Sequence, residues 1–178
     1  TMNSQFAVPG AFGYNPTLTS WPYDPEKAKQ LLSEAGYPNG FKLTGEVRDF
    51  FDIWAQVQSD LSKVGVELEL NNIVQAEWLK KFLGTSWDSA SFSLALGFGP
   101  EMDAGRVALW QSCRKNPPHY CNQEVMPLID AIDSEFDAEK RKEMLHRLMT
   151  IMKEDTPALM LFEQVDFFGL SKRVQNFE

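Results

Sequence analysis

Acidic, aromatic and glycine residues gather in one short stretch near the middle of the chain, GFGPEMDAG. Glu101 and Asp103 follow a predicted strand close to the aromatic Phe98, and this set could hold an ammonium group through charge-assisted hydrogen bonds. The alternative is a solvated turn in which Asp103 caps the next helix. Trp110 follows on a short predicted helix. The candidate ligand-binding residues are therefore Phe98, Gly99, Glu101, Asp103 and Trp110.

The glycines of this stretch do not predict a phosphate site. Gly97, Gly99 and Gly105 lack the G-x-G-x-x-G spacing. Pro100 has no backbone N–H to donate, and the Glu101 carboxylate repels a phosphate group. A cationic group on the ligand fits the stretch better, and no cofactor is expected.

Catalysis by a nucleophile is the main alternative function. It requires a Ser or Cys beside a base, which is usually a histidine. The chain has two histidines, His119 and His146, and no G-x-S-x-G motif. Its many carboxylates are the background of an acidic chain. We therefore expect no catalytic site, and a small acidic α/β hydrolase that uses one of these histidines stays the alternative.

Two cysteines, Cys113 and Cys121, flank a short segment that contains two prolines. In an oxidising compartment they are expected to close a small loop through a disulfide worth roughly 2–3 kcal/mol, and the alternative is two unpaired cysteines. A metal site made of these cysteines and His119 lacks a fourth ligand and the usual paired spacing, so no metal is expected.

Length and composition limit the class of protein. The 178 residues suit one domain or one lobe of a larger protein, and the 43% hydrophobic share is enough for a core. The net charge of −8 argues against a nucleic-acid partner. No apolar run approaches the about 18 residues of a membrane span. Residues 1–22 show no signal peptide and are predicted to be an irregular segment from the middle of a longer chain.

The first half of the chain predicts alternating helices and strands. Asp24, Pro25 and Gly36 bracket a helix whose apolar stripe contains Leu31 and Leu32. Strands are expected at FKLTGEV and at VELEL, where apolar and acidic residues alternate. A helix from about Phe51 to Lys63 joins them, with Trp54 on its apolar face. Strand, helix and strand in this order predict a parallel pair.

The second half predicts more helix than strand. Helices are expected over 76–83, 107–111, 124–134 and 137–155, the last capped by Asp137 and ended by Thr156-Pro157. Strands are expected over 91–96 and in the closing segments ALMLF and VDFFGL, as two strands or one bent strand. The predicted fold class is α/β, with a mixed, largely parallel sheet flanked by helices.

The segment YDPEKAKQLLSEAGYPNGF closely resembles a signature of the family 5 extracellular solute-binding proteins, which are the peptide, nickel and oligopeptide receptors of ABC importers. Four further segments resemble the same family in the same order, so the resemblance runs from Tyr14 to Phe177. They are VQSDLSKVGVELEL, FSLALGFGPEMD, the block from HYCNQEV to DTPALMLF, and GLSKRVQNF.

The resemblance implies one lobe of a bilobal periplasmic-binding-protein-like receptor, with residues 23–178 as the second lobe and the first lobe elsewhere in the protein. It implies a periplasmic or extracytoplasmic, and in some cases membrane-anchored, protein that captures a peptide or other small solute and delivers it to membrane permease subunits. A signalling or peptide-handling module without transport is the further alternative.

Family members that bind peptides hold the peptide's amino terminus with an acidic residue after the glycine loop. That residue corresponds here to Glu101, or to Asp103 if the loop is shifted. GFGPEMD departs from the family's usual Asp-Pro, which leaves the recognition of an amine open. Some members carry a bridge where Cys113 and Cys121 stand.

Overall fold

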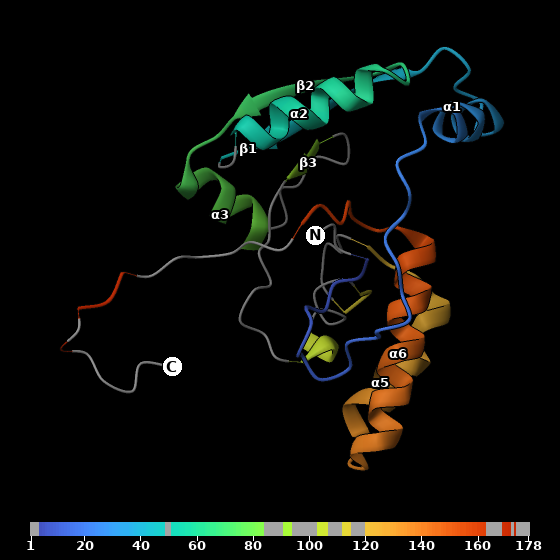
Figure 1. Cartoon of the computed structure of the whole chain (residues 1–178), viewed down its shortest axis with the longest axis vertical. Helices are drawn as coiled ribbons and strands as arrows, with labels where there is room; N and C mark the ends of the chain where they lie inside the picture. The colour runs from blue at the N-terminus through green and yellow to red at the C-terminus, as the bar shows by residue number, and fades with distance from the viewer. Residues whose placement is uncertain are drawn as a thin grey trace. The chain divides into compact units, whose positions relative to one another are not determined.

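The computed structural model describes residues 4–48, 51–83, 91–93, 103–106, 112–114, 120–162, 169–171 and 173, and for residues 82, 83 and 91–93 the backbone alone. Two compact units share the chain (Figure 1). The sheet unit comprises Trp21–Leu96 and Trp110–Gln123. The helical unit comprises Thr1–Ser20, Gly97–Leu109 and Glu124–Glu178. None of the helices in the described ranges has the length and apolar character that crossing a membrane requires.

Helix α1, Pro25–Glu34, begins and ends as its sequence predicts. The Asp24 carboxylate accepts a hydrogen bond from the Lys27 N–H at 2.9 Å, which caps the first turn. Gly36, with φ of +90°, reverses the chain at the other end. The apolar stripe is not buried among the described residues, since Leu31 is 51% exposed.

The centre of the sheet unit is a β–α–β element. Strand β1, Phe41–Val47, pairs in parallel with β2, Val66–Asn72, over its whole length. Helix α2, Phe51–Ser62, connects the two strands and packs against the sheet (Figure 1). Trp54 from α2 is 1% exposed and shares a small core with Val47 and Leu68. The predicted parallel pair is confirmed.

The third described strand determines the topology of the sheet. Strand β3, Ser91–Ser93, pairs in parallel with the other side of β1, so the strand order is β2-β1-β3. Helix α3, Gln75–Leu83, follows β2. The predicted α/β fold class with a parallel sheet is therefore confirmed, while positions 94–96 of the predicted third strand lie outside the described residues.

Two glycines let the chain pass close to itself at the amino end of the sheet. Gly40 has φ of +72° and Gly65 has φ of +87°, a region that side chains disfavour. A Cβ atom added to Gly40 would lie 1.8 Å from the Gly65 carbonyl oxygen. Both positions therefore require glycine, for conformation and for space.

The helical unit is built on a helix hairpin. A short 3₁₀ turn, Gln123–Val125, leads into α5, Met126–Ser134, and a brief connection leads to α6, Ala138–Asp155. The Asp137 carboxylate caps α6 by accepting hydrogen bonds from the N–H groups of Glu139 and Lys140, both at 3.1 Å. Thr156, in a left-handed conformation, ends it. Both predicted helices are confirmed.

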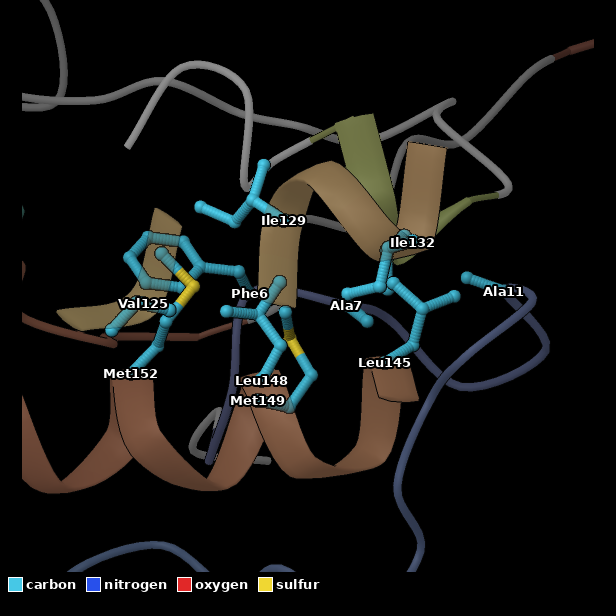
Figure 2. Packing of buried hydrophobic residues seen from close by; sticks show 11 residues of the cluster. Phe6, Ala7, Ala11, Val125, Ile129, Ile132, Leu145, Leu148, Met149 and Met152 are labelled. Carbon is cyan, nitrogen blue, oxygen red and sulfur yellow. The ribbon is translucent and has the colours of Figure 1, made fainter. Parts of the chain in front are cut away.

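Buried side chains from α5, α6 and the N-terminal segment form the main core (Figure 2). Leu145 and Leu148 of α6 are fully buried, and Ile129 and Ile132 of α5 face the same cluster. The other buried members are Phe6, Ala7, Ala11, Ala104, Val125, Met149 and Met152. Apolar residues spaced three and four apart on α6 produce this face.

The described part of the N-terminal segment, residues 4–20, is irregular, as its sequence predicts. Buried Gln5 fixes it by accepting a hydrogen bond from the Asn15 N–H at 2.9 Å and donating one to the Asn15 carbonyl at 2.7 Å. The Asn15 side-chain amide in turn donates to the His146 carbonyl on α6. These bonds satisfy polar groups that burial would otherwise penalise.

The strand predicted at ALMLF, residues 158–162, is wrong. Ala158 and Met160 are partly buried against the helical core and Leu159 is exposed, so the alternating pattern is present. No described segment offers these residues a ladder of backbone hydrogen bonds, and they adopt an irregular extended path. Alternating apolar residues indicate that one side of a segment contacts an apolar surface, and in ALMLF that surface is formed by helices. Most of VDFFGL lies outside the described residues.

Candidate functional site

The strand order identifies where a ligand would bind in the sheet unit. β2 and β3 lie on opposite sides of β1, and the chain passes from β2 across β1 to reach β3, so the strand order reverses at β1. In open parallel sheets, ligands bind outside the carboxyl ends of the strands at such a switch point. Among the described residues, those at the end of β1 lie at this position.

Arg48 comes directly after β1 and is held in a defined orientation. Its guanidinium carbon lies 4.2 Å from the centre of the Trp78 ring on α3, a cation–π contact. Its Nη1 donates a hydrogen bond to the side-chain carbonyl of Gln75 at the start of α3. Two contacts of this kind orient the guanidinium, a group suited to carboxylate recognition.

A second ionic group lies at the same end of β1. The partly buried Glu46 carboxylate pairs with Lys81 of α3, and Glu77 also lies within 3.8 Å of the Lys81 ammonium. Glu46 Oε2 is buried without a hydrogen-bond partner among the described residues. The carboxyl end of β1 therefore carries polar groups of both signs, joined to α3 by hydrogen bonds and ion pairs.

Asp103 lies in the helical unit and makes internal contacts. Its Oδ2 accepts from Arg141 Nη1 at 2.8 Å and its Oδ1 from Nη2 at 3.2 Å. Oδ1 also accepts from the Gly105 N–H at 2.8 Å, which corresponds to the capping role considered from the sequence. Phe98, Gly99, Glu101 and Trp110 lie outside the described residues, so Asp103 alone among the predicted ligand-binding residues has a described position.

His146 is a structural residue in the described chain. Its Nε2 donates a hydrogen bond to the Tyr14 carbonyl oxygen at 3.0 Å, which joins α6 to the N-terminal segment. His119 lies outside the described residues. Within the described ranges, no group of three or more His, Cys, Asp and Glu side chains is arranged to bind a metal ion.

Cys113 and Cys121 are joined by a disulfide, with their Cα atoms 4.4 Å apart. Neither thiol is therefore free to act as a nucleophile. We expect reduction of this bond to lower the free energy of unfolding of the sheet unit by roughly 2–3 kcal/mol, because the unfolded chain regains the entropy of an open loop.

The chain offers a specific measurement of this effect, because all five tryptophans lie within the sheet unit. The midpoint of denaturant unfolding followed by tryptophan fluorescence should fall when a reductant is added. A variant with both Cys113→Ser and Cys121→Ser should already unfold at the lower midpoint and should not respond to the reductant. An unchanged midpoint in the reduced wild type would contradict the expectation.

Within the part of the chain that the structure describes, three surface groups have shifted pKa values, and all lie away from the carboxyl ends of the strands. The hydrogen bond to Glu67 raises the pKa of Lys42. The hydrogen bond between Asp60 and Lys63 lowers the pKa of Asp60 and raises that of Lys63. These exposed ion pairs contribute little to the stability of the fold. Any contribution of Asp60 is lost as the pH falls through its lowered pKa, and that of the lysines as the pH rises through their raised pKa values.

An open hollow of about 490 Å³ lies between α5 and α6. Two carboxylates and one arginine are among the residues that line it, which are Glu124, Pro127, Leu128, Ala131, Glu143, Met144 and Arg147. None of the residues singled out from the sequence lines it. We assign no ligand to this hollow.

No pattern in the sequence selects Arg48, Gln75 or Trp78 as ligand-binding residues. The available signal was positional: an arginine follows directly after the first strand of a predicted parallel pair. Its importance depends on the strand order, because only the placement of β3 makes the end of β1 a switch point. That long-range pairing is not encoded in a local pattern.

The sheet unit is therefore of the α/β type and carries polar groups of both signs at the carboxyl end of β1. The family model described as bacterial extracellular solute-binding proteins, family 5 middle, matches residues 3–116. The chain belongs to this family of extracellular solute-binding proteins.

Known relatives align with nearly all of the chain. The dipeptide-binding protein of Escherichia coli is 28% identical over 95% of the chain, and heme-binding protein A of Haemophilus influenzae is 28% identical over 95%. The solved structure of HbpA2 from Haemophilus parasuis matches 90% of the chain with a TM-score of 0.76 at 21% identity, which supports the fold. The chain spans about a third of these proteins: 34%, 33% and 34% of their lengths respectively.

Proposed function

We propose that this chain is the second, ligand-binding lobe of the receptor of an ABC importer. The receptor captures a peptide or other small solute between two lobes and delivers it to membrane permease subunits, without changing the solute chemically. The observation that carries the proposal is the β2-β1-β3 order, with oriented polar groups at the carboxyl end of β1, in a chain of the solute-binding family. The disulfide agrees with an extracytoplasmic location.

Two sets of residues are proposed to face the solute. Arg48, oriented by Trp78 and Gln75, places a positive charge at the carboxyl end of β1, where it would attract a carboxylate of the solute. Phe98, Gly99, Glu101 and Trp110 belong to the segment after β3, where Glu101 would accept an ammonium group. Because the Asp103 carboxylate already faces Arg141, Glu101 is the better of the two acidic candidates. A carboxylate on the solute would suit Arg48, and an amine would suit Glu101.

The test is thermal unfolding of the receptor that carries this lobe together with its first lobe. The panel consists of dipeptides, haemin, an opine, an oligosaccharide and a nickel chelate. At a ligand concentration of about 100 times Kd, binding to the native state alone should stabilise by roughly 2.7 kcal/mol and raise Tm by several degrees. No shift with any member of the panel would count against the proposal.

A matched pair of variants tests the site within the same assay. Arg48→Met should abolish the ligand-dependent shift, because it removes the donors while keeping an apolar stem. Lys42→Met removes a cation from the amino end of the same strand, where it pairs with Glu67, and should leave the shift intact. If both variants bind like the wild type, Arg48 does not contact the solute.

A further inference from the structure

Three segments of the helical unit that are far apart in the sequence meet at one point. The Ala104 N–H donates to the Phe12 carbonyl at 2.9 Å, and Phe12 and Asp103 form an isolated parallel bridge. Ala104 is 1% exposed and belongs to the helical core. The side chain of Arg141 on α6 completes the junction through its two hydrogen bonds to Asp103.

All three nitrogens of the Arg141 guanidinium donate hydrogen bonds at this junction. Nη1 and Nη2 bind the two Asp103 oxygens, and Nε donates to the Ile132 carbonyl at the end of α5 at 3.2 Å. The guanidinium carbon lies 5.3 Å from the centre of the Phe12 ring. A lysine has no such fork, and its single ammonium could not reproduce this set of contacts.

The space around the junction is also filled. A Cβ atom added to Gly105 would lie 2.8 Å from Arg141 Nη2 and 3.1 Å from Asp103 Oδ1. Asp103 Oδ1 already accepts the Gly105 N–H, so three donors occupy its carboxylate, which has about four acceptor positions. A ligand ammonium would have to displace Arg141, which binds Asp103 through two hydrogen bonds and whose side chain is only 22% exposed.

Resting on the proposed function, we propose that Arg141 is a positioning residue of the ligand site. Arg141 clamps Asp103, and with it the turn at residues 103–106, against α6 and the N-terminal segment. The chain that directly precedes Asp103 contains the proposed solute-facing Glu101, so the clamp fixes the end from which that segment departs. Asp103 serves the site through this clamp and does not contact the solute.

Amide hydrogen exchange of the 178-residue chain tests the clamp without any ligand. Arg141→Met should speed exchange at the Ala104 and Gly105 amides by roughly tenfold or more, and Arg141→Lys should recover part of the protection. The amides of Thr156 and Ile73, bonded to Met152 and Val47, should change by less than about twofold. Lys142→Met, which removes a neighbouring cation paired with Glu139, is the matched control and should change none of these rates.

Unchanged exchange at Ala104 and Gly105 in Arg141→Met would overturn the clamp. An equal rise in the exchange rate at all of these amides would also overturn the clamp, since it would show a general loss of stability.

A second readout separates the clamp from the proposed function. In the complete receptor, the panel member that stabilises the wild type should bind Arg141→Met with an affinity lower by roughly tenfold or more. Arg141→Lys should recover part of this affinity, and Lys142→Met should bind with the affinity of the wild type. Full affinity in Arg141→Met would overturn the positioning role while the receptor function stands. If no panel member stabilises the wild type, the receptor function fails, whereas the exchange experiment still decides the clamp.

Discussion

Replacing Gly40 by alanine is expected to lower the free energy of unfolding of the sheet unit by about 3 kcal/mol or more. The added Cβ atom would lie 1.8 Å from the Gly65 carbonyl oxygen and 2.3 Å from its carbonyl carbon. Both are backbone atoms, so no side chain can rotate away to relieve the overlap. The φ of +72° at Gly40 adds the cost of a left-handed conformation, about 1–2 kcal/mol for other residues.

Gly36→Ala provides the matched control for this experiment. Gly36 has φ of +90°, yet an added Cβ atom would meet nothing within 4 Å. Its substitution should cost about 1–2 kcal/mol from conformation alone. The measurement is the midpoint of denaturant unfolding followed by tryptophan fluorescence. Equal losses in the two variants would show that the close approach to Gly65 contributes nothing.

Leu148→Ala should lower the free energy of unfolding of the helical unit by about 3 kcal/mol, within the usual range of 2–5 kcal/mol for a buried leucine. The Leu148 side chain is fully buried in the core that α6 shares with α5 and the N-terminal segment (Figure 2). Truncation leaves a cavity that the neighbouring helices can only partly close. Leu159→Ala is the matched control, because Leu159 is 53% exposed and should lose less than about 1 kcal/mol.

Two signals separate the helical unit from the sheet unit in this test. The helical unit contains none of the five tryptophans, so fluorescence follows the sheet unit alone, whereas circular dichroism at the helix band follows the helices of both units. Leu148→Ala should move the part of the dichroism transition that comes from the helical unit to lower denaturant and leave the fluorescence transition in place. A shift of both transitions by the same amount would contradict the expectation that each unit has its own core.

The sequence predicted the elements of the fold where local signals agree with one another. β1, α2 and β2 were predicted nearly to the residue, because alternation, a helical stripe and a glycine stop follow in order. The same holds for α6, whose cap at Asp137 and stripe through Leu148 lie within one segment. Where a helix cap and an apolar stripe, or the patterns of a strand and the next helix, follow each other in one segment, the local sequence alone determines the secondary structure.

The sequence could not predict features that depend on partners far along the chain. ALMLF has the alternation of a strand, but whether a strand pairs with it is decided by residues elsewhere. Asp103 meets Arg141 across 38 positions, and no local pattern indicates that this acid has a structural partner. Arg48 and Trp78 likewise meet only because the helix after β2 folds back to the end of β1.

The family resemblance added what composition and spacing could not, namely a class of function. It did so because five segments appear in the family's order, and the match to residues 3–116 supports the same conclusion. It leaves the solute open, since the relatives named above bind compounds as different as dipeptides and haem.

The division of the chain between the two units affects how the protein is made. Phe6, Ala7 and Ala11 are translated before the sheet unit, yet they pack against α6, which is translated after it. At ordinary rates of synthesis they wait roughly ten seconds or more for that helix. Most of the sheet unit can form during this interval, while an apolar N-terminal segment remains uncovered. On the ribosome, the nascent chain therefore exposes this apolar segment to chaperones while the sheet unit is being made.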